Sequence, residues 1–325
     1  MAENEILKVE NLVTSFNTEA GRIRAVDDVS FAVNKGEVFG IVGESGCGKS
    51  VTALSIMRLL PKPAGQIDSG RIIFSGTDIV SLPVESMHQI RGNKISMIFQ
   101  EPMTALNPVH TIGDQINEVY LLRNPGRKIK DIREDSIEML KKVGISDPEK
   151  RIKDYPHSIS GGMRQRVMIA MALACKPDVL IADEPTTALD VTIQAQILDL
   201  MKKLQDETGM AIIFITHALG VIAETSKRVL VMYAGKIAET APVESLFKKP
   251  MHPYTKGLFL SIPRLEGKRK TRLHVIKGAV PALNELPEGC RFKNRCPEAM
   301  DICGTVSPPS VRIEDNHFVS CYLYV

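Results

Sequence analysis

An eight-residue segment from Gly43 to Ser50 has the pattern GxxxxGKS. Its glycines let the main chain curl so that several N–H groups point at phosphate oxygens, and a helix that follows adds its positive end. In this pattern Lys49 reaches the β- and γ-phosphates and the Ser50 hydroxyl ligates Mg²⁺. The alternative is a glycine-rich turn that binds no phosphate and matches the pattern by chance. A strand predicted before the segment and a helix predicted after it favour the phosphate site.

A phosphate loop of this kind needs an acidic partner on a neighbouring strand. The apolar run Val179–Ala182 ends at Asp183 and Glu184, where an α/β sheet places its ligands. We expect Asp183 to hold Mg²⁺ through water and Glu184 to act as general base for the attacking water. The alternative is a strand end with two solvated carboxylates.

A second anion site is predicted at Ser160, where the hydroxyl and the amides of Gly161 and Gly162 open a helix. The surrounding segment, residues 158–166, resembles the signature of the ABC ATPases, usually written LSGGQ. Ile159 replaces the Leu, and Met163 stands where Gln is common. The resemblance implies that this site closes on the γ-phosphate of ATP held by an opposite subunit, so that the active unit is a head-to-tail pair.

Other landmarks of the ABC family follow in order. Gln100 resembles the glutamine that senses γ-phosphate and Mg²⁺, and Ala188-Leu189-Asp190 resembles the loop that communicates across the pair. His217 resembles the switch histidine, and Phe16 stands where an aromatic ring stacks on adenine, although single residues of these types are more often packed in a core. Ala218 departs from the Asp common after the histidine. The resemblance implies nucleotide contacts from Gly43, Glu44, Ser45, Gly46, Cys47, Gly48, Lys49, Ser50 and Val51.

The chain alternates predicted strands and helices, which indicates an α/β fold. Strands are expected at Ile6–Val9, Val29–Val33, Val38–Val42, Arg71–Phe74, Ile95–Phe99, Val179–Ala182, Ala211–Ile215, Arg228–Met232 and Lys236–Glu239. Helices are expected at Ser50–Leu60, Ile132–Val143, Met163–Ala174 and Thr192–Gln205. The resemblance implies a P-loop NTPase core over 1–240, with a mixed sheet in a RecA-like subdomain, an antiparallel β subdomain and a helical subdomain at about 101–165. Frequent prolines after residue 241 predict a small irregular extension over 241–325.

Two further segments, 100–108 and 251–255, resemble the ATPases of dipeptide and oligopeptide importers, a group that includes nickel-uptake relatives. The resemblance implies that residues after Gln100 line a groove for a coupling helix of a membrane subunit. It also implies a second ATPase subunit, identical or more often a paralogue, two transmembrane permease subunits and an extracytoplasmic substrate-binding protein. Peptide is the expected substrate, with nickel as the alternative.

Four of the six cysteines, Cys290, Cys296, Cys303 and Cys321, lie in the last 36 residues. A reducing compartment disfavours disulfides, so a metal centre explains four thiols better. Structural zinc usually has close pairs of cysteines, which this spacing lacks, whereas a [4Fe–4S] cluster takes four cysteines at wider spacing. The segment resembles that of peptide-importer ATPases that bind such a cluster. Zinc and four free thiols remain alternatives.

Composition limits the other possibilities. The chain is 44% hydrophobic with a net charge of +3, which is too small to argue for nucleic acid. Neither a signal peptide nor an apolar run of about 18–20 residues is present, so we expect a cytosolic protein at the cytoplasmic face of the membrane. A basic cluster at Lys268, Arg269, Lys270 and Arg272 could contact anionic lipid, but most such clusters are solvated linkers.

Three other classes of protein are weighed against a transporter ATPase. Non-transport ABC enzymes that organise or repair DNA carry long coiled coils, and this sequence has no sustained heptads. Ribosome-associated ABC proteins carry two ATPase halves, and only one GxxxxGKS segment is present. A C-terminal zinc ribbon that binds nucleic acid would lose affinity as salt rises.

Overall fold

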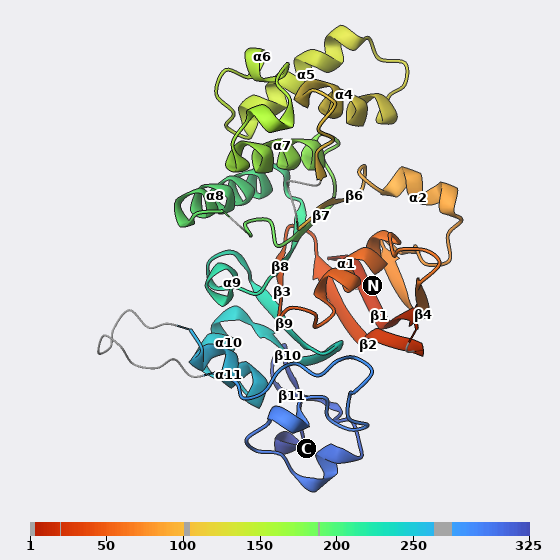
Figure 1. Ribbon diagram of the computed structural model, residues 1–325, viewed down its shortest axis with the longest axis vertical. Helices are drawn as coiled ribbons and strands as arrows, with labels where there is room; N and C mark the ends of the chain where they lie inside the picture. The colour runs from red at the N-terminus through yellow and green to blue at the C-terminus, as the bar shows by residue number, and fades with distance from the viewer. Residues whose placement is uncertain (1–3, 20, 101–104, 188, 263–274) are drawn as a thin grey trace.

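Among the described residues, eight strands form the main sheet in the order β11-β12-β10-β9-β3-β8-β7-β6. The strands β6, β7, β8, β3 and β9 run parallel, and β10, β12 and β11 continue the sheet antiparallel. Their bounds are β3 (Val38–Val42), β6 (Ile95–Ile98), β7 (Val179–Asp183), β8 (Ala211–Thr216), β9 (Arg228–Tyr233), β10 (Lys236–Pro242), β11 (Ser310–Glu314) and β12 (His317–Ser320). The structure, a computed structural model, describes residues 4–19, 21–100, 105–187, 189–262 and 275–325 (Figure 1).

A second, antiparallel sheet has the order β2-β1-β4-β5. Its strands are β1 (Glu5–Thr18), β2 (Gly21–Asn34), β4 (Gly65–Phe74) and β5 (Thr77–Asp78). Figure 1 shows it beside α1, against one side of the main sheet. The expected antiparallel β subdomain and the mixed sheet are therefore both confirmed.

Helices cover the other parts of the molecule. They are α1 (Lys49–Met57), α2 (Val84–Ile90), α4 (Ile112–Arg123), α5 (Ile129–Lys142), α6 (Pro148–Arg151), α7 (Gly161–Leu173), α8 (Val191–Thr208), α9 (Leu219–Thr225), α10 (Val243–Lys248) and α11 (Pro253–Leu260). In Figure 1, α4 to α7 form a helical layer at one end of the molecule, as expected for the segment after residue 101. None of the helices in the described ranges is both long and apolar enough to cross a bilayer.

The parallel strands are buried on both faces because alternate residues enter two different cores. In β8, Ile213 and Ile215 pack with α1 and the antiparallel sheet. Their neighbours Ile212 and Phe214 pack in the larger core, which includes α7, α8 and the helical layer. The short continuous apolar runs in the sequence are explained by this arrangement.

The segment after residue 241 is less irregular than the sequence predicts. Its last residues form the hairpin β11–β12, and β12 pairs with β10 through Glu239↔Val319 and Thr240↔Phe318. These short strands carry alternating exposed residues and follow two prolines, so they give little apolar signal. The hairpin extends the main sheet, and Phe292 from the same segment packs in the larger core.

Glu239 joins the main sheet to the C-terminal segment. Its side chain is fully buried and accepts hydrogen bonds from the N–H groups of Met251 (2.8 Å) and His252 (2.9 Å). The His317 Nε2 atom, from β12, lies 2.7 Å from Glu239 Oε1. One buried carboxylate therefore fixes both the start of α11 and the hairpin to β10.

We predict that Glu239→Gln lowers the free energy of unfolding by about 3 kcal/mol, because an amide cannot accept all of these bonds and each bond to a charged group contributes substantially. Urea denaturation measures the loss, and limited proteolysis is expected to cut within residues 241–325. The matched control is Glu314→Gln, whose partner Lys249 is exposed. Equal effects of the two changes would contradict this role of Glu239.

Candidate active site

The phosphate loop predicted at Gly43–Ser50 connects β3 to α1, and two of its glycines allow close main-chain approaches. A Cβ atom at Gly43 would lie 2.2 Å from the carbonyl oxygen of Met232. At Gly48, where φ is +102°, it would lie 2.6 Å from the carbonyl oxygen of Ala25. Real Cβ atoms do not come so close to main chain, so the loop requires glycine at both positions.

Lys49 is only 4% exposed and lies inside this loop. Its ammonium group donates to the carbonyl oxygens of Gly43 (2.8 Å) and Glu44 (3.1 Å). Ser45 and Gly46, at the rim of the loop, are exposed to solvent. The loop thus presents a positive charge, an open rim and the amino end of α1 in one place, as binding of an anion requires.

Asp183 ends β7 and is 3% exposed. Its Oδ1 atom is buried and has no hydrogen-bond partner within the described residues. Burial raises the pKa of Asp183, and a hydrogen bond from Ser50 only partly offsets this effect. A buried carboxylate oxygen without a partner, beside a serine hydroxyl, suits a hard cation such as Mg²⁺.

Glu184 is surrounded by three polar side chains. Gln100 Nε2 donates to Glu184 Oε2 (3.2 Å), Thr187 Oγ1 donates to the same oxygen (2.9 Å), and His217 Nδ1 lies 3.3 Å from Glu184 Oε1. Burial alone would raise the pKa of Glu184, but the hydrogen bonds from Thr187 and His217 outweigh it and hold the pKa below its usual range. The carboxylate is therefore charged at neutral pH, as a general base must be.

These residues meet because they follow parallel strands at one edge of the sheet. Gly43 follows β3, Glu184 follows β7, Gln100 comes shortly after β6 and His217 comes directly after β8. Parallel strands bring their carboxyl ends to the same edge, where α/β proteins bind ligands. The geometry suits hydrolysis of a nucleoside triphosphate: a loop for the phosphates, a buried oxygen for a cation and a charged base.

The predicted signature segment lies apart from this loop. Ser160 is the N-cap of α7 and accepts the N–H of Met163 (3.3 Å), and Ser160 and Gly161 are exposed. Figure 1 shows α7 in the helical layer, well separated from α1. Asp190 caps α8 by accepting the N–H of Ile193 (2.9 Å). Ala188 lies outside the described residues.

Several other predicted features have a place in the structure or fall outside it. Phe16 is half-buried on β1, and its ring packs over the main chain of Gly65 on β4. Val51 is half-buried in α1. Of the residues after Gln100 that are predicted to line a coupling groove, 101–104 lie outside the described residues. The basic cluster at 268–272 also lies outside them.

Sequence reasoning missed three residues that bear on this site. Thr187 donates to Glu184, and nothing in its local sequence marks it. Tyr254 Oη accepts the N–H of Glu44 (2.9 Å), and Arg295 pairs with the Glu44 carboxylate. Tyr254 belongs to the segment 251–255 that marks the family resemblance, which was the only available signal.

The four C-terminal cysteines are free, and they lie close enough to influence one another's pKa. The N–H of Cys290 donates to the carbonyl oxygen of Cys303 (2.8 Å), and a Cβ at Gly289 would lie 2.4 Å from that oxygen. Burial raises the pKa of Cys296 to about 11, with further contributions from the other three thiols. Within the described ranges, no group of three or more His, Cys, Asp or Glu side chains is arranged to hold a metal ion.

Comparison with known proteins gives two family matches. Residues 26–187 match the family described as "ABC transporter", and residues 238–303 match "Oligopeptide/dipeptide transporter, C-terminal region". A putative peptide import ATP-binding protein of Brucella abortus (strain 2308) is 53% identical, covering 99% of this chain and 98% of that protein. The dipeptide transport ATP-binding protein DppD of Bacillus subtilis (strain 168) is also 53% identical, covering 98% and 95%.

Solved structures give the same result for the fold. A dimeric post-hydrolysis state of the ATP-binding cassette MJ0796, bound to ADP and Pi, matches with a TM-score of 0.66 and 27% identity, covering 73% of this chain and 98% of that one. CbiO1 from Clostridium perfringens, part of the ABC transporter complex CbiONQ, matches with a TM-score of 0.64 and 28% identity, covering 76% and 92%.

We predict that Thr187→Val shifts the acid limb of the pH profile of triphosphate hydrolysis to higher pH. Loss of the hydroxyl removes a bond to the charged form of Glu184, so its pKa rises and less base is present in mildly acidic solution. The measurement is kcat/KM against pH. Thr225→Val, a change remote from Glu184, is expected to leave the profile in place; an unshifted Thr187→Val profile would rule out Glu184 as the group that titrates.

Proposed function

The chain belongs to the ABC transporter family, in the group with the oligopeptide/dipeptide C-terminal region, and we propose that it is the ATP-hydrolysing subunit of an importer of dipeptides or oligopeptides. The observation that carries the proposal is identity above 50% over nearly the whole chain with peptide import ATP-binding proteins. The arrangement of Lys49, Asp183 and Glu184 at one sheet edge supplies the chemistry such a subunit needs.

The phosphate loop binds the triphosphate of ATP through its main-chain amides, and Lys49 lies against its β- and γ-phosphates. Glu184 accepts the proton of the attacking water. Hydrogen bonds from Gln100 and Thr187 hold its carboxylate in place for this step. His217 Nδ1 lies 3.3 Å from the same carboxylate. In this proposal its imidazole also contacts the γ-phosphate of bound ATP. Phosphoryl transfer of this kind depends mainly on positioning and charge, which these groups provide.

We assign Asp183, Ser50 and Gln100 as the residues that would hold Mg²⁺. The support is the buried Asp183 Oδ1 atom, which has no other hydrogen-bond partner within the described residues. A bound Mg²⁺ would neutralise negative charge on the phosphates. Asp183 would then keep its carboxylate ionised despite burial, because the cation would offset the cost of charging it.

The ATP site is completed by a second ATPase subunit, more often a paralogue than an identical copy in this group. The exposed amino end of α7, with Ser160, Gly161 and Gly162, is an anion site that lies apart from the chain's own loop. Placed over the γ-phosphate of the partner's ATP, it would add main-chain donors to the transferred group. Hydrolysis then depends on closure of the pair, and product release reopens it.

The remaining partners are two permease subunits and an extracytoplasmic substrate-binding protein, with the chain peripheral at the cytoplasmic face of the membrane. Residues 1–240 form the nucleotide-binding domain in this proposal, and 241–325 form the extension. The names of the relatives support peptide as the substrate. Nickel, the alternative from the family resemblance, is an outcome of the test below.

We further propose a [4Fe–4S] cluster on Cys290, Cys296, Cys303 and Cys321. The support is the spacing of the four thiols, which lacks the close pairs usual for structural zinc, together with their mutual influence on pKa. The cluster would supply a cross-link between segments around 290–303 and the C-terminus.

We predict that Glu184→Gln lowers ATP hydrolysis by about 10²- to 10⁴-fold while ATP still binds, because it removes the general base and leaves the loop intact. The importer, reconstituted in vesicles with its binding protein, is expected to take up peptide in the wild type and not in the variant. Glu207→Gln, at an exposed helical site, serves as control. Uptake of Ni²⁺ without peptide would replace the substrate assignment, and an unimpaired Glu184→Gln would refute the base.

We predict about four iron atoms and four acid-labile sulfides per chain after anaerobic purification, as a cubane cluster requires. Cys303→Ser is expected to lose most of the iron, and Cys175→Ser, outside the group, to keep it. Metal analysis and the visible absorption spectrum check both variants. One zinc ion per chain without acid-labile sulfide would contradict the cluster and support a zinc site on these cysteines.

A further inference from the structure

Glu44, the second residue of the phosphate loop, is held by two residues from the distant C-terminal part of the chain. The Arg295 guanidinium makes a two-pronged ion pair with its carboxylate, Nη1 to Oε2 at 2.7 Å and Nη2 to Oε1 at 3.0 Å. Tyr254 Oη accepts the N–H of the same residue at 2.9 Å. Charge-assisted pairs with this fork geometry are among the strongest polar contacts in proteins.

Arg295 is itself fixed in place. Its side chain is 5% exposed, its Nε atom donates to the carbonyl oxygen of Lys277 (3.1 Å), and its charge lies 5.7 Å from the centre of the Tyr233 ring. The Tyr233 and Tyr254 rings pack together with centroids 4.7 Å apart, and Phe292 packs against both. The arginine therefore reaches Glu44 from a rigid base and loses little freedom when it pairs.

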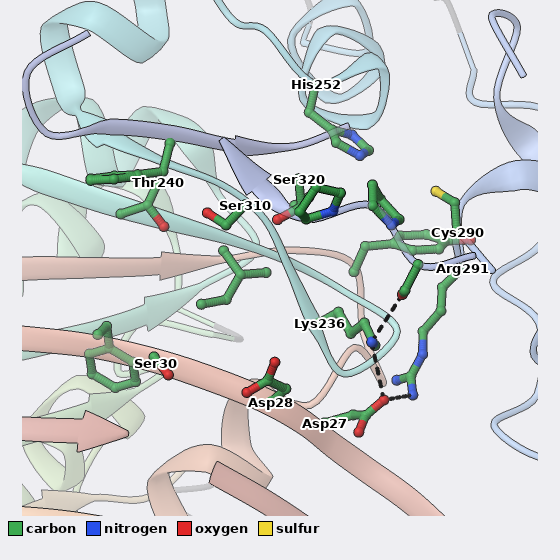
Figure 2. Close-up of a pocket in the computed structure, with 18 of the residues that line it drawn as sticks. Asp27, Asp28, Ser30, Lys236, Thr240, His252, Cys290, Arg291, Ser310 and Ser320 are labelled. Carbon is green, nitrogen blue, oxygen red and sulfur yellow. Dashed lines mark hydrogen bonds and ion pairs between the residues drawn. The ribbon is translucent and has the colours of Figure 1, made fainter. Parts of the chain in front are cut away.

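A second arginine of the same short segment supports the other side of the loop. Arg291 donates to the carbonyl oxygen of Ala234 and pairs with Asp27. The next residue, Gly235, donates its N–H to the carbonyl oxygen of Cys47 inside the loop (2.8 Å). Figure 2 shows Arg291 and Lys236 meeting at Asp27, at the wall of a cavity of about 680 Å³ between the antiparallel sheet and the C-terminal segment.

The charge of Glu44 makes the first of these contacts important for nucleotide binding. A carboxylate in the second position of the loop stands close to the place where a highly anionic triphosphate binds, and like charges at short range repel strongly. Arg295 offsets the charge of that carboxylate through both of its oxygens. The pair also fixes Glu44, the residue that directly precedes the exposed rim of Ser45 and Gly46.

We propose that Arg295 is a positioning residue for ATP: it neutralises Glu44 and holds the first half of the phosphate loop in its curled form, so that the C-terminal segment sets the affinity for nucleotide. A loop already ordered before binding does not spend free energy on ordering during binding. The inference rests on the proposed ATP site and not on the identity of the transported substrate.

The test is a double-mutant cycle on the full-length chain, with the dissociation constant of a fluorescent ATP analogue measured in Mg²⁺. The chain contains no tryptophan, so the signal comes from the analogue alone. We expect Arg295→Met to raise the dissociation constant about tenfold or more, because it leaves the Glu44 charge uncompensated. Glu44→Gln alone should have a smaller effect, and the double variant should bind better than Arg295→Met.

Steady-state kinetics separate positioning from general damage. We expect Arg295→Met to raise KM for ATP and to leave kcat within about twofold at saturation, since the base and the cation site are untouched. Arg295→Lys keeps the charge without the fork and should give an intermediate dissociation constant. Lys249→Met, which removes an exposed ion pair in the same C-terminal segment, should change neither quantity.

Two results would overturn the inference. One is an unchanged dissociation constant in folded Arg295→Met or Arg295→Lys protein, and the other is a double variant no better than Arg295→Met. Failure of the ATP site itself gives a different pattern: the wild type would not bind the analogue, or Lys49→Ala would bind it equally well. The single variants are checked by thermal unfolding, so that a misfolded protein is not counted as a loss of affinity.

Discussion

Main-chain amides can bind a triphosphate only while the loop that carries them keeps its curled shape, and this constraint explains much of the surrounding structure. The loop has no side-chain packing of its own at its exposed rim, so its shape is imposed from outside. The carbonyl oxygen of Met232 excludes any Cβ at Gly43, and the N–H of Gly235 holds the carbonyl of Cys47. Both contacts come from β9 and the turn after it, which the main sheet keeps rigid.

The electrostatic balance of the site follows from the same arrangement. Three acidic residues, Glu44, Asp183 and Glu184, lie at an edge that must accept a polyanion, and each has a different compensation. Arg295 pairs with Glu44, and Asp183 keeps a buried oxygen available for a cation. Glu184 is stabilised as a carboxylate mainly by hydrogen bonds from Thr187 and His217, with a smaller contribution from the charge of Lys49. Unlike Glu44, it has no two-pronged arginine partner among the described residues.

The parts of this site that could be predicted from sequence are the local ones. The GxxxxGKS segment and the Asp183–Glu184 pair are each continuous in the chain, and the apolar runs before them indicate parallel strands. Gln100 and His217 entered through family resemblance, and the structure places both at Glu184. The Glu44–Arg295 pair joins residues 251 positions apart, and no periodicity or composition signals it. The hairpin β11–β12 was missed because its strands are short and half exposed.

In the proposed mechanism, nucleotide affinity and hydrolysis are controlled from different places. The contacts that shape the phosphate loop, from Tyr254 and Arg295, belong to the same chain and exist before any partner arrives. Ser160, which N-caps α7, is exposed to solvent in the helical layer, and α7 lies apart from the chain's own phosphate loop. Under the proposal that a second subunit completes the ATP site, a single subunit is ordered for ATP binding but lacks part of the catalytic site. In this proposal, the separation of ATP binding from completion of the catalytic site couples hydrolysis to transport. A subunit that hydrolysed ATP alone would do so without moving a substrate.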